Sequence, residues 1–289
     1  MTTAAPVRSF LRLVAIEHSV FALPFAYVSA VTAMELHDGG LDVATLLLIT
    51  VAMVAGRTVA MAANRLIDRE LDARNPRTAQ RELVTGAVSL GTARTGAVLA
   101  LVLFLACCAA LGPVPLALAP LAVAPLVVYP YGKRFTDYPH AILALAQAVA
   151  PVGAWIAVTG HWSWSAVVLG VGVGLWIGGF DLVYACQDTA SDRAQGVRSF
   201  PARWGNQAAL LTARSVHVVA LGLFAWFGEL EGFGPLWYVG LVATAAAFVY
   251  QHSIVSADDL SRVDRSFFTS NGFVALALGA SGLLDLALR

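Results

Sequence analysis

Nine apolar runs divide the sequence, and each is long enough to cross a bilayer as a helix. They are bounded by polar residues or by glycine and proline, and they cover about 10–34, 43–66, 92–112, 114–132, 140–159, 164–186, 207–228, 234–254 and 267–287. A transmembrane helix needs roughly 20 mainly apolar residues, and inside a bilayer a chain must satisfy its own backbone hydrogen bonds. The sequence therefore predicts an all-α polytopic membrane protein with about nine transmembrane helices, forming a single domain over residues 1–289.

Composition supports this fold class and excludes others. Hydrophobic residues make up 58% of the chain and charged residues 12%, whereas soluble domains contain about 25% charged residues. The formal net charge is zero, so there is no basic field that would attract nucleic acid. Glu17 and His18 interrupt the first apolar run, which we expect to be a retained helix and not a cleaved signal peptide. The cysteines lie in apolar runs without metal-ligand spacing, and we expect them to be packing residues: Cys107, Cys108 and Cys186.

The distribution of positive charge predicts the orientation in the membrane. Of the eighteen Lys and Arg residues, all but Arg289 lie at the N-terminus, near the connections after the second, fourth, sixth and eighth runs, or in the flanking helices. Positively charged connections stay on the cytoplasmic side of a membrane. We therefore expect a plasma-membrane protein with its N-terminus and these connections in the cytoplasm, its C-terminus outside, and a central cavity open to the cytoplasmic side.

A first island of charge follows the second apolar run, in the polar segment 64–91. Its residues 64–81 read NRLIDRELDARNPRTAQR. Asn64, Asp68 and Asp72 are spaced at i, i+4 and i+8, which places their side chains on one face of a helix. Three oxygen-bearing groups are thereby predicted to converge on one point.

A second island of charge lies in the polar segment 181–206, where residues 181–192 read DLVYACQDTASD. Asp181, Tyr184 and Asp188 share a helix face at i, i+3 and i+7, and Asp192 follows one turn later. The charge distribution places this island on the same side of the membrane as the first. Both islands are therefore predicted to face one cavity.

The five aspartates of the two islands indicate a site for Mg²⁺ and a diphosphate. A carboxylate at the bilayer centre costs roughly 2.5 to 3.5 kcal/mol, so these side chains are expected to face a wet, cation-filled cavity. Oxygen ligands without accompanying His or Cys suit Mg²⁺. Nearby cations suited to phosphate oxygens complete the pattern: Arg65, Arg69, Arg74, Arg77, Arg81, Lys133, Arg134, Arg193 and Arg198.

Two other interpretations of the charged islands remain open. They are salt bridges at the membrane surface, or they are the acids of an ion-coupled transporter, which carry protons or Na⁺. Transporter acids usually lie near the bilayer midplane, whereas these lie at helix ends and continue into long basic connections. The pattern therefore favours an enzyme.

Arg57 lies seven residues before Asn64, on the same helix face and two turns deeper. An arginine at that depth needs an anionic partner, and its planar guanidinium suits a carboxylate. We expect it to bind the carboxyl group of an acceptor substrate, with Glu17 as the alternative partner. Four histidines lie at helix ends without metal-ligand spacing and receive no assignment: His140, His161, His217 and His252.

Both islands resemble the signatures of the UbiA superfamily of intramembrane aromatic prenyltransferases. The pattern N-x-x-x-D-x-x-x-D matches Asn64 to Asp72, and D-x-x-Y-x-x-x-D-x-x-x-D matches Asp181 to Asp192. The resemblance extends over nearly the whole chain, including the runs at 16–26 and 129–136. Within the superfamily, the sequence is similar in particular to menaquinone-pathway members that prenylate 1,4-dihydroxy-6-naphthoate. Segments 64–89 and 178–188 carry this similarity. Asn64-Arg65 and Glu82 depart from many 4-hydroxybenzoate enzymes, which are the alternative.

The resemblance implies a mechanism and roles for individual residues. Mg²⁺ held by Asp68 and Asp72, and by Asp188 and Asp192, neutralises an allylic polyprenyl diphosphate, whose cation is then attacked by an aromatic acid. Arg77, Arg81 and Lys133 match positions that contact phosphate oxygens, and Arg198 is a further candidate. Asn64 is expected to orient a metal-bound water or the acceptor. Tyr129 and Tyr184 are expected to place their rings against the developing cation.

The connection from Asp72 to Gly91 is expected to cover the site. Water must be kept from the allylic cation, or the prenyl donor is hydrolysed. Gly86 and Gly91 are the expected hinges of this cover.

Overall fold

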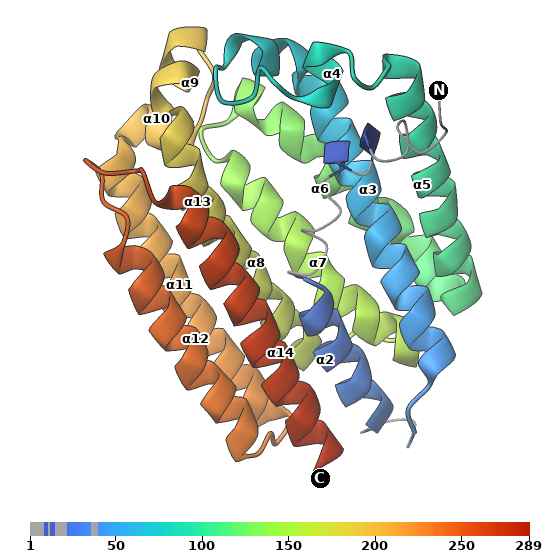
Figure 1. Ribbon diagram of the computed structural model, residues 1–289. Helices are drawn as coiled ribbons and strands as arrows, with labels where there is room; N and C mark the ends of the chain where they lie inside the picture. The colour runs from blue at the N-terminus through green and yellow to red at the C-terminus, as the bar shows by residue number, and fades with distance from the viewer. Residues whose placement is uncertain (1–8, 11, 15–21, 36–39) are drawn as a thin grey trace.

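The chain is described here by a computed structural model that covers residues 9–10, 12–14, 22–35 and 40–289, and every regular element of length in these ranges is a helix (Figure 1). The elements of the first half are α2 (Leu23–Ala33), α3 (Val43–Arg74), α4 (Glu82–Thr85), α5 (Leu90–Leu111), α6 (Pro113–Phe135) and α7 (Pro139–Thr159). Those of the second half are α8 (Trp164–Ala185), η3 (Cys186–Asp188), α9 (Thr189–Gln195), α10 (Phe200–Trp204), α11 (Asn206–Leu230), α12 (Pro235–Ser253), α13 (Val263–Arg265), η4 (Ser266–Ser270) and α14 (Asn271–Ala287).

The membrane-spanning architecture is confirmed. Seven helices in the described ranges are long and apolar enough to cross a bilayer. The shorter apolar helix α2 lies within the first predicted run, and the less apolar α12 coincides with the eighth. The predicted count of nine is therefore an approximate one, and the all-α polytopic fold class is correct.

Helix α3 continues beyond the predicted end of its apolar run. The apolar run was expected to end near residue 66, and the helix continues to Arg74, as the helical spacing of Asn64, Asp68 and Asp72 predicts. Hydropathy falls where the chain leaves the apolar region, whereas the backbone hydrogen bonds continue until Asn75 adopts an extended conformation and donates its N–H to Asp72 O. At the other end, Asp42 accepts hydrogen bonds from the first free amides of the helix. The first island is therefore carried on a continuous helix.

Helix α8 is the central element, because glycines let its neighbours approach closely. Gly170 and Gly174 lie on the face that meets α7, four residues apart. A Cβ at either position would lie 2.4 Å from a backbone oxygen of α7, at Ala148 and Ala144 respectively. Small residues at this spacing allow helix backbones to pack directly in a membrane. The second island, at the end of α8, is thereby fixed against α7.

Aromatic side chains fill the core on the other side of α8. Trp176 of α8 packs with Phe25 of α2, and Phe25 stacks on Phe224 of α11. Phe227 and Trp237 extend the same cluster to α12. All five side chains are fully buried, and each contributes a large apolar area to stability. The second half is therefore a rigid support for α8.

The short helices gather at one end of the bundle. In Figure 1, α4, α9, α10 and α13 lie at the upper end, whereas the C-terminus lies at the opposite end. The two polar segments, 64–91 and 181–206, both reach the upper end. The two polar segments thus lie at one end of the bundle and the C-terminus at the other. The distribution of positive charge predicts the same separation.

The connection between α3 and α5 is anchored to its neighbours. Leu83 and Val88 are buried in an apolar cluster with side chains of α3 and α5. Arg69 also donates a hydrogen bond to Leu83 O, at 3.2 Å. Gly86 ends α4 with φ of 78°, a conformation that favours glycine. Gly91 was expected to be a hinge at the end of the connection. It lies instead in the first turn of α5, because this helix begins at Leu90.

Candidate active site

The two islands meet at a cavity of about 190 Å³. It lies between α3, α6, α7 and α8, and the connection after α3 closes one side. Eleven of the thirteen residues predicted for the site line it: Asn64, Asp68, Asp72, Arg77, Arg81, Tyr129, Lys133, Asp181, Tyr184, Asp188 and Asp192. The convergence of both motifs is therefore a feature of the fold, while the role of each residue stays a prediction.

The aspartates of the first motif are held by cations. Asp68 is 1% exposed, and its two oxygens contact Lys133 Nζ at 2.6 Å and Arg134 NH1 at 3.1 Å, both from α6. Asp72 contacts Arg81 NH1 at 2.6 Å. Buried carboxylates need such partners, since an unpaired buried charge is strongly unfavourable. Each carboxylate of this motif is thus neutralised by groups suited to phosphate.

Asp188 of the second motif is held from the opposite half of the molecule. It accepts hydrogen bonds from Asn75 Nδ2 and Arg77 Nε, both at 2.8 Å, and it also pairs with the terminal Arg77 nitrogen NH2. Arg77 NH1 donates to Tyr184 Oη at 2.8 Å, and the guanidinium carbon lies 4.9 Å from the centre of the Tyr184 ring. Burial lowers the pKa of Arg77, but the hydrogen bond and charge of Asp188 outweigh it and raise the pKa above its ordinary value.

Asp181 and Asp192 contact neither lysine nor arginine within the described ion pairs. His140 Nδ1 lies 2.6 Å from Asp181 Oδ2, and Tyr129 Oη donates to the same oxygen at 3.3 Å. Asp192 Oδ2 accepts a hydrogen bond from Ser199 Oγ at 2.8 Å. These two carboxylates therefore differ from the neighbouring aspartates, which pair with lysine or arginine.

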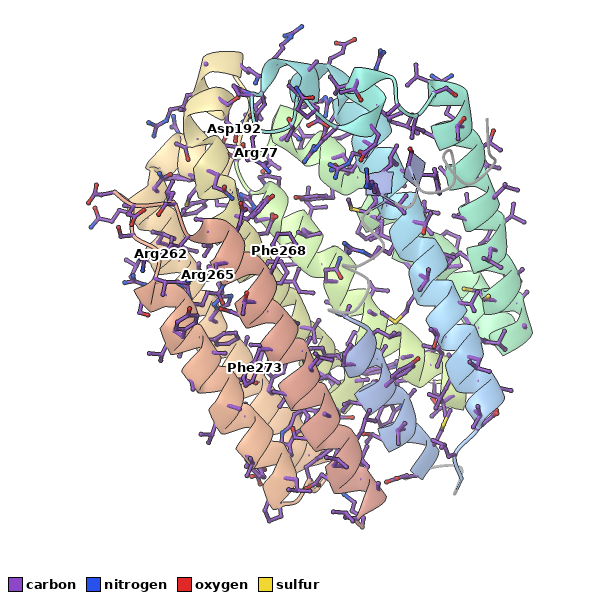
Figure 2. The ribbon with its side chains drawn as sticks, in the orientation of Figure 1. Arg77, Asp192, Arg262, Arg265, Phe268 and Phe273 are labelled. Carbon is purple, nitrogen blue, oxygen red and sulfur yellow. The ribbon has the colours of Figure 1, made fainter. Side chains whose placement is uncertain are left out.

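Figure 2 shows Arg77 and Asp192 close together at the end of the bundle where α9 lies. Both side chains belong to the lining of the same cavity. Four other labelled residues lie away from these two, along the segment that contains α13, η4 and the start of α14: Arg262, Arg265, Phe268 and Phe273.

Two predicted site residues do not line the cavity. Arg198 donates to Asp137 at 2.8 and 3.1 Å and to Phe135 O at 3.0 Å, so its guanidinium fixes the connection between α6 and α7. The hydrogen bond from Arg198 holds the pKa of Asp137 below its ordinary value. Arg57 lies deeper on α3, outside the lining. Its alternative partner Glu17 lies outside the described residues, as does His18.

Sequence reasoning missed several polar residues of the cavity. His140 received no assignment, because a lone histidine in the first turn of an apolar helix carries no motif. Asn75 lies three residues after Asp72, and this spacing was the available signal for it. Further polar residues of the lining come from the connections and from the turn after α8: Thr78, Gln195 and Ser199.

The oxygen ligands fit Mg²⁺ only together with a phosphate. Within the described ranges, no three His, Cys, Asp or Glu side chains are placed to hold one metal ion. Mg²⁺ commonly binds one or two carboxylates and completes its shell with water and substrate phosphates. The carboxylates of the cavity, without sulfur ligands, suit this mode of binding. The protein would therefore not form a complete metal cage by itself.

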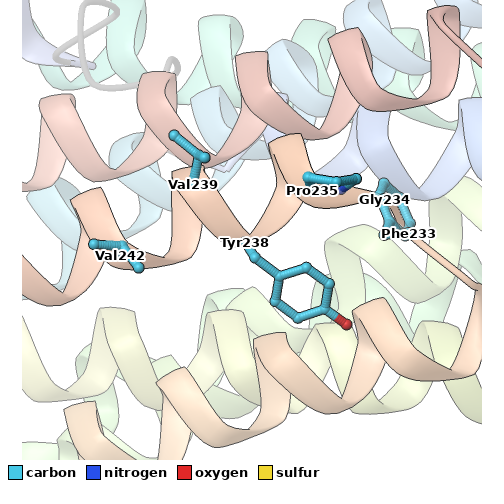
Figure 3. A pocket seen from close by; sticks show the side chains of 6 residues that line it. All are labelled: Phe233, Gly234, Pro235, Tyr238, Val239 and Val242. Atoms are coloured by element: carbon cyan, nitrogen blue, oxygen red, sulfur yellow. The ribbon is translucent and has the colours of Figure 1, made fainter.

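A larger recess of about 700 Å³ lies along the first turns of α12 and the connection before it, at the other end of the bundle (Figure 3). Its lining contains no charged side chain, and it consists of Phe233, Gly234, Pro235, Tyr238, Val239 and Val242. Apolar surface of this kind is ordinary where a protein faces lipid tails. Reactive groups are concentrated in the smaller, polar cavity.

Known proteins share both the sequence and the fold of this chain. Residues 22–273 match the model of the UbiA prenyltransferase family. A 4-hydroxybenzoate octaprenyltransferase of Nitrosococcus oceani is 31% identical over 245 residues, which are 82% of this chain and 83% of that protein. A protein of the same name from Alkalilimnicola ehrlichii is 30% identical and covers 86% of this chain and 84% of its own length.

Two solved structures have the same arrangement of helices. A UbiA homologue from Aeropyrum pernix K1, solved in the apo form, is 34% identical with a TM-score of 0.84, covering 93% of this chain and 98% of that one. A UbiA homologue from Archaeoglobus fulgidus, solved with GPP and Mg²⁺, shares the fold at 18% identity and a TM-score of 0.69, covering 96% and 99%. The chain therefore belongs to the UbiA prenyltransferase family and is a membrane prenyltransferase.

Proposed function

We propose that this protein transfers a polyprenyl group from an allylic polyprenyl diphosphate to an aromatic acid, with Mg²⁺ as cofactor. The observation that carries the proposal is the meeting of both aspartate motifs with Arg77, Arg81 and Lys133 in one cavity. The single domain works in the plasma membrane, with its site facing the cytoplasm. The concentration of Lys and Arg in the connections at that end supports this orientation.

Binding of the prenyl donor requires the ion pairs of the cavity to open. A volume of about 190 Å³ is smaller than the roughly 300–1,000 Å³ of typical ligand pockets. Asp68, Asp72, Asp188 and Asp192 would hold Mg²⁺, which neutralises the diphosphate and makes it a better leaving group. The cations released from these carboxylates then bind the phosphate oxygens. The same side chains thereby neutralise the site in its empty and in its occupied state.

The movement of Arg77 from Asp188 to the phosphate also exposes the face of the Tyr184 ring. Its guanidinium covers the ring of Tyr184 in the present arrangement. When Arg77 turns to phosphate, this ring becomes available to the allylic carbon, where positive charge develops as the carbon–oxygen bond breaks. The anchored connection around Leu83 keeps bulk water from that carbon.

The acceptor that the comparisons favour is 4-hydroxybenzoate. Curated relatives of about 30% identity are named 4-hydroxybenzoate octaprenyltransferases, whereas none of the findings supports the naphthoate predicted from segments 64–89 and 178–188. Arg57 is the proposed partner of the acceptor carboxylate, which would place the aromatic ring on the membrane side of the aspartates. The family match disfavours the ion-coupled transporter.

A transfer assay in lipid vesicles tests the proposal. Purified protein is supplied with Mg²⁺, an allylic polyprenyl diphosphate and either 4-hydroxybenzoate or 1,4-dihydroxy-6-naphthoate. We expect prenylated 4-hydroxybenzoate, and we expect no product with EDTA or in Asp68→Asn and Asp188→Asn. The control is Asp258→Asn, which makes the same change on an exposed connection. Prenylation of the naphthoate alone would reverse the acceptor assignment, and folded protein that prenylates neither acid would overturn the proposal.

A further inference from the structure

The cavity contains a histidine to which no role has been given. His140 lies in the first turn of α7, is 7% exposed, and lines the cavity beside Asp181 and Tyr129. Its Nδ1 atom is 2.6 Å from Asp181 Oδ2. Its Nε2 atom is buried and has no hydrogen-bond partner in the described part of the chain. The side chain is therefore held at one nitrogen and unpaired at the other.

The contact with Asp181 determines what the unpaired nitrogen can do. A carboxylate accepts hydrogen bonds, so Nδ1 carries the hydrogen and Nε2 of the neutral ring presents a lone pair. Leaving such a buried acceptor unpaired destabilises the folded protein. A fold tolerates this arrangement where a ligand supplies the missing partner. Tyr129 also donates to Asp181, which keeps this carboxylate oriented towards the histidine.

Close packing of α7 on α8 keeps the histidine and the aspartate together. A Cβ at Gly178, three residues before Asp181, would lie 3.0 Å from Ala144 Cβ and 3.4 Å from His140 O. The contacts of Gly170 and Gly174 hold the rest of the helix pair at the same short distance. The spacing of His140 and Asp181 is thus set by backbone packing and does not depend on a flexible loop.

The other bases of the cavity are engaged. Asp68, Asp72 and Asp188 contact lysine or arginine side chains. Asp192 accepts a hydrogen bond from Ser199, and in the proposed function all four carboxylates hold the metal. Gln195 Oε1 is a second buried acceptor without a partner, but an amide oxygen is a very weak base. His140 is therefore the basic side chain of the cavity that is oriented by one ring nitrogen and presents the other without a partner.

We propose that His140 is the catalytic base that removes the ring proton of the aromatic acceptor, an inference that rests on the proposed prenyl transfer. The ring carbon forms a bond to the allylic carbon, and the bond from that carbon to the diphosphate oxygen breaks. The same ring carbon then loses its hydrogen as a proton to His140 Nε2, and the electron pair restores the aromatic ring. Asp181 stabilises the imidazolium through Nδ1–H, and the proton leaves to water with the product.

Isotopic substitution and chemical rescue test this role in the full-length protein in lipid vesicles. We expect His140→Ala to slow transfer by about 10²-fold, the lower end for a general base. Imidazole should restore part of the rate, and the less basic 1,2,4-triazole, which has similar size, should restore less. With the acceptor deuterated at its reactive ring positions, the wild-type protein should show little isotope effect, whereas His140→Ala should show a normal one because proton loss becomes rate-limiting.

Matched variants separate catalysis from folding. His161→Ala removes an exposed histidine from the connection after the far end of α7 and should leave the rate and the isotope effect unchanged. Asp181→Asn, a change in a positioning residue, should lower the rate and respond less to imidazole, because His140 is still present. Thermal melting and binding of inorganic diphosphate monitor the fold of each variant.

The possible results decide between the two proposals. If the wild-type protein transfers no prenyl group, the proposed function itself fails. If the wild-type protein is active and folded His140→Ala keeps its rate, or loses it without an isotope effect and without rescue by imidazole, His140 is a structural residue and the inference is wrong.

Discussion

The two aspartate motifs are neutralised in different ways. Asp68 and Asp72 of the first motif pair with cations from their own half of the molecule, on α6 and on the connection after α3. Asp188 of the second motif pairs with Arg77, which also comes from the first half. Among the described ion pairs, the second half supplies carboxylates to the cavity and no cation. The site is thus complete only when α8 docks against the first half.

This asymmetry distinguishes Arg77 from Arg81. Arg77 contacts both oxygens of Asp188 through two nitrogens and also reaches Tyr184, whereas Arg81 makes a single contact with Asp72. A forked contact needs the planar guanidinium, and a single contact needs only positive charge. Arg77 is accordingly the residue whose chemical type joins the two motifs.

Removal of the metal has the largest expected effect, and it tests whether the motifs remain distinct. EDTA should abolish prenyl transfer, because the diphosphate then lacks its main neutralising charge. Under these metal-free conditions, Asp68→Asn should bind inorganic diphosphate more tightly than Asp188→Asn, since it releases two cations and not one. Isothermal titration measures both affinities. Equal affinities would remove the distinction between the motifs.

Replacement of the two arginines by lysine has the next largest expected effect. Arg77→Lys should reduce kcat/KM for the prenyl diphosphate by about 10-fold or more, because it loses a forked, charge-assisted contact of about 1.5–3 kcal/mol. Arg81→Lys keeps a charge for a single contact and should lose much less. Steady-state kinetics of the two variants make a matched comparison, and an equal loss would show that both residues act only through charge.

Tyr184→Phe should have a smaller effect. The variant keeps the ring beneath Arg77 and removes only the hydroxyl that accepts a hydrogen bond at 2.8 Å. One such hydrogen bond contributes about 1 kcal/mol, and Arg77 gives it up in the proposed function when the donor binds, so we expect kcat/KM to change by no more than a few-fold. Tyr184→Leu, which also removes the aromatic face, should be distinctly worse in kcat. Similar kinetics for the two variants would exclude a role of the ring.

The smallest effect is expected outside the cavity, at Asp137 and Arg198. Asp137→Asn should leave the rate of prenyl transfer at neutral pH unchanged. A changed rate would support the sequence-based prediction that Arg198 binds the substrate. Arg198 lowers the pKa of Asp137 in the folded protein, so the pair stabilises above the ordinary carboxylate pKa of about 3.9. The stabilisation disappears as the pH falls through the lower folded value. Melting temperatures of wild type and variant should therefore converge in strong acid.

Much of the site was predictable because its motifs lie on helices. Asn64, Asp68 and Asp72 keep the one-face spacing on α3, and Asp181 and Tyr184 keep theirs on α8. Helical periodicity therefore sufficed to place each motif. The meeting of the two motifs followed from the charge distribution, which put them on the same side of the membrane.

The rest depended on packing that periodicity does not describe. His140 reaches Asp181 because glycines of α8 bring α7 unusually close, and no local pattern around residue 140 indicates this contact. Arg198 was assigned to phosphate from its charge, whereas the turn after α9 directs it to Asp137. The extent of α3 beyond its apolar run was indicated by the helical spacing of Asn64, Asp68 and Asp72 and not by hydropathy, because hydropathy reports the solvent of a segment and not its backbone conformation.

The length of α3 links the position of the site to bilayer thickness. Its 32 residues form a rod about 48 Å long at 1.5 Å per residue, whereas a hydrocarbon core is about 30 Å thick. We therefore expect the aspartates at its end to lie in the headgroup layer, where water and ions can reach them. Lipids with longer acyl chains would draw these charges towards hydrocarbon, whereas shorter chains would leave them in water. Acyl-chain length is thus expected to set the ionic surroundings of the reaction.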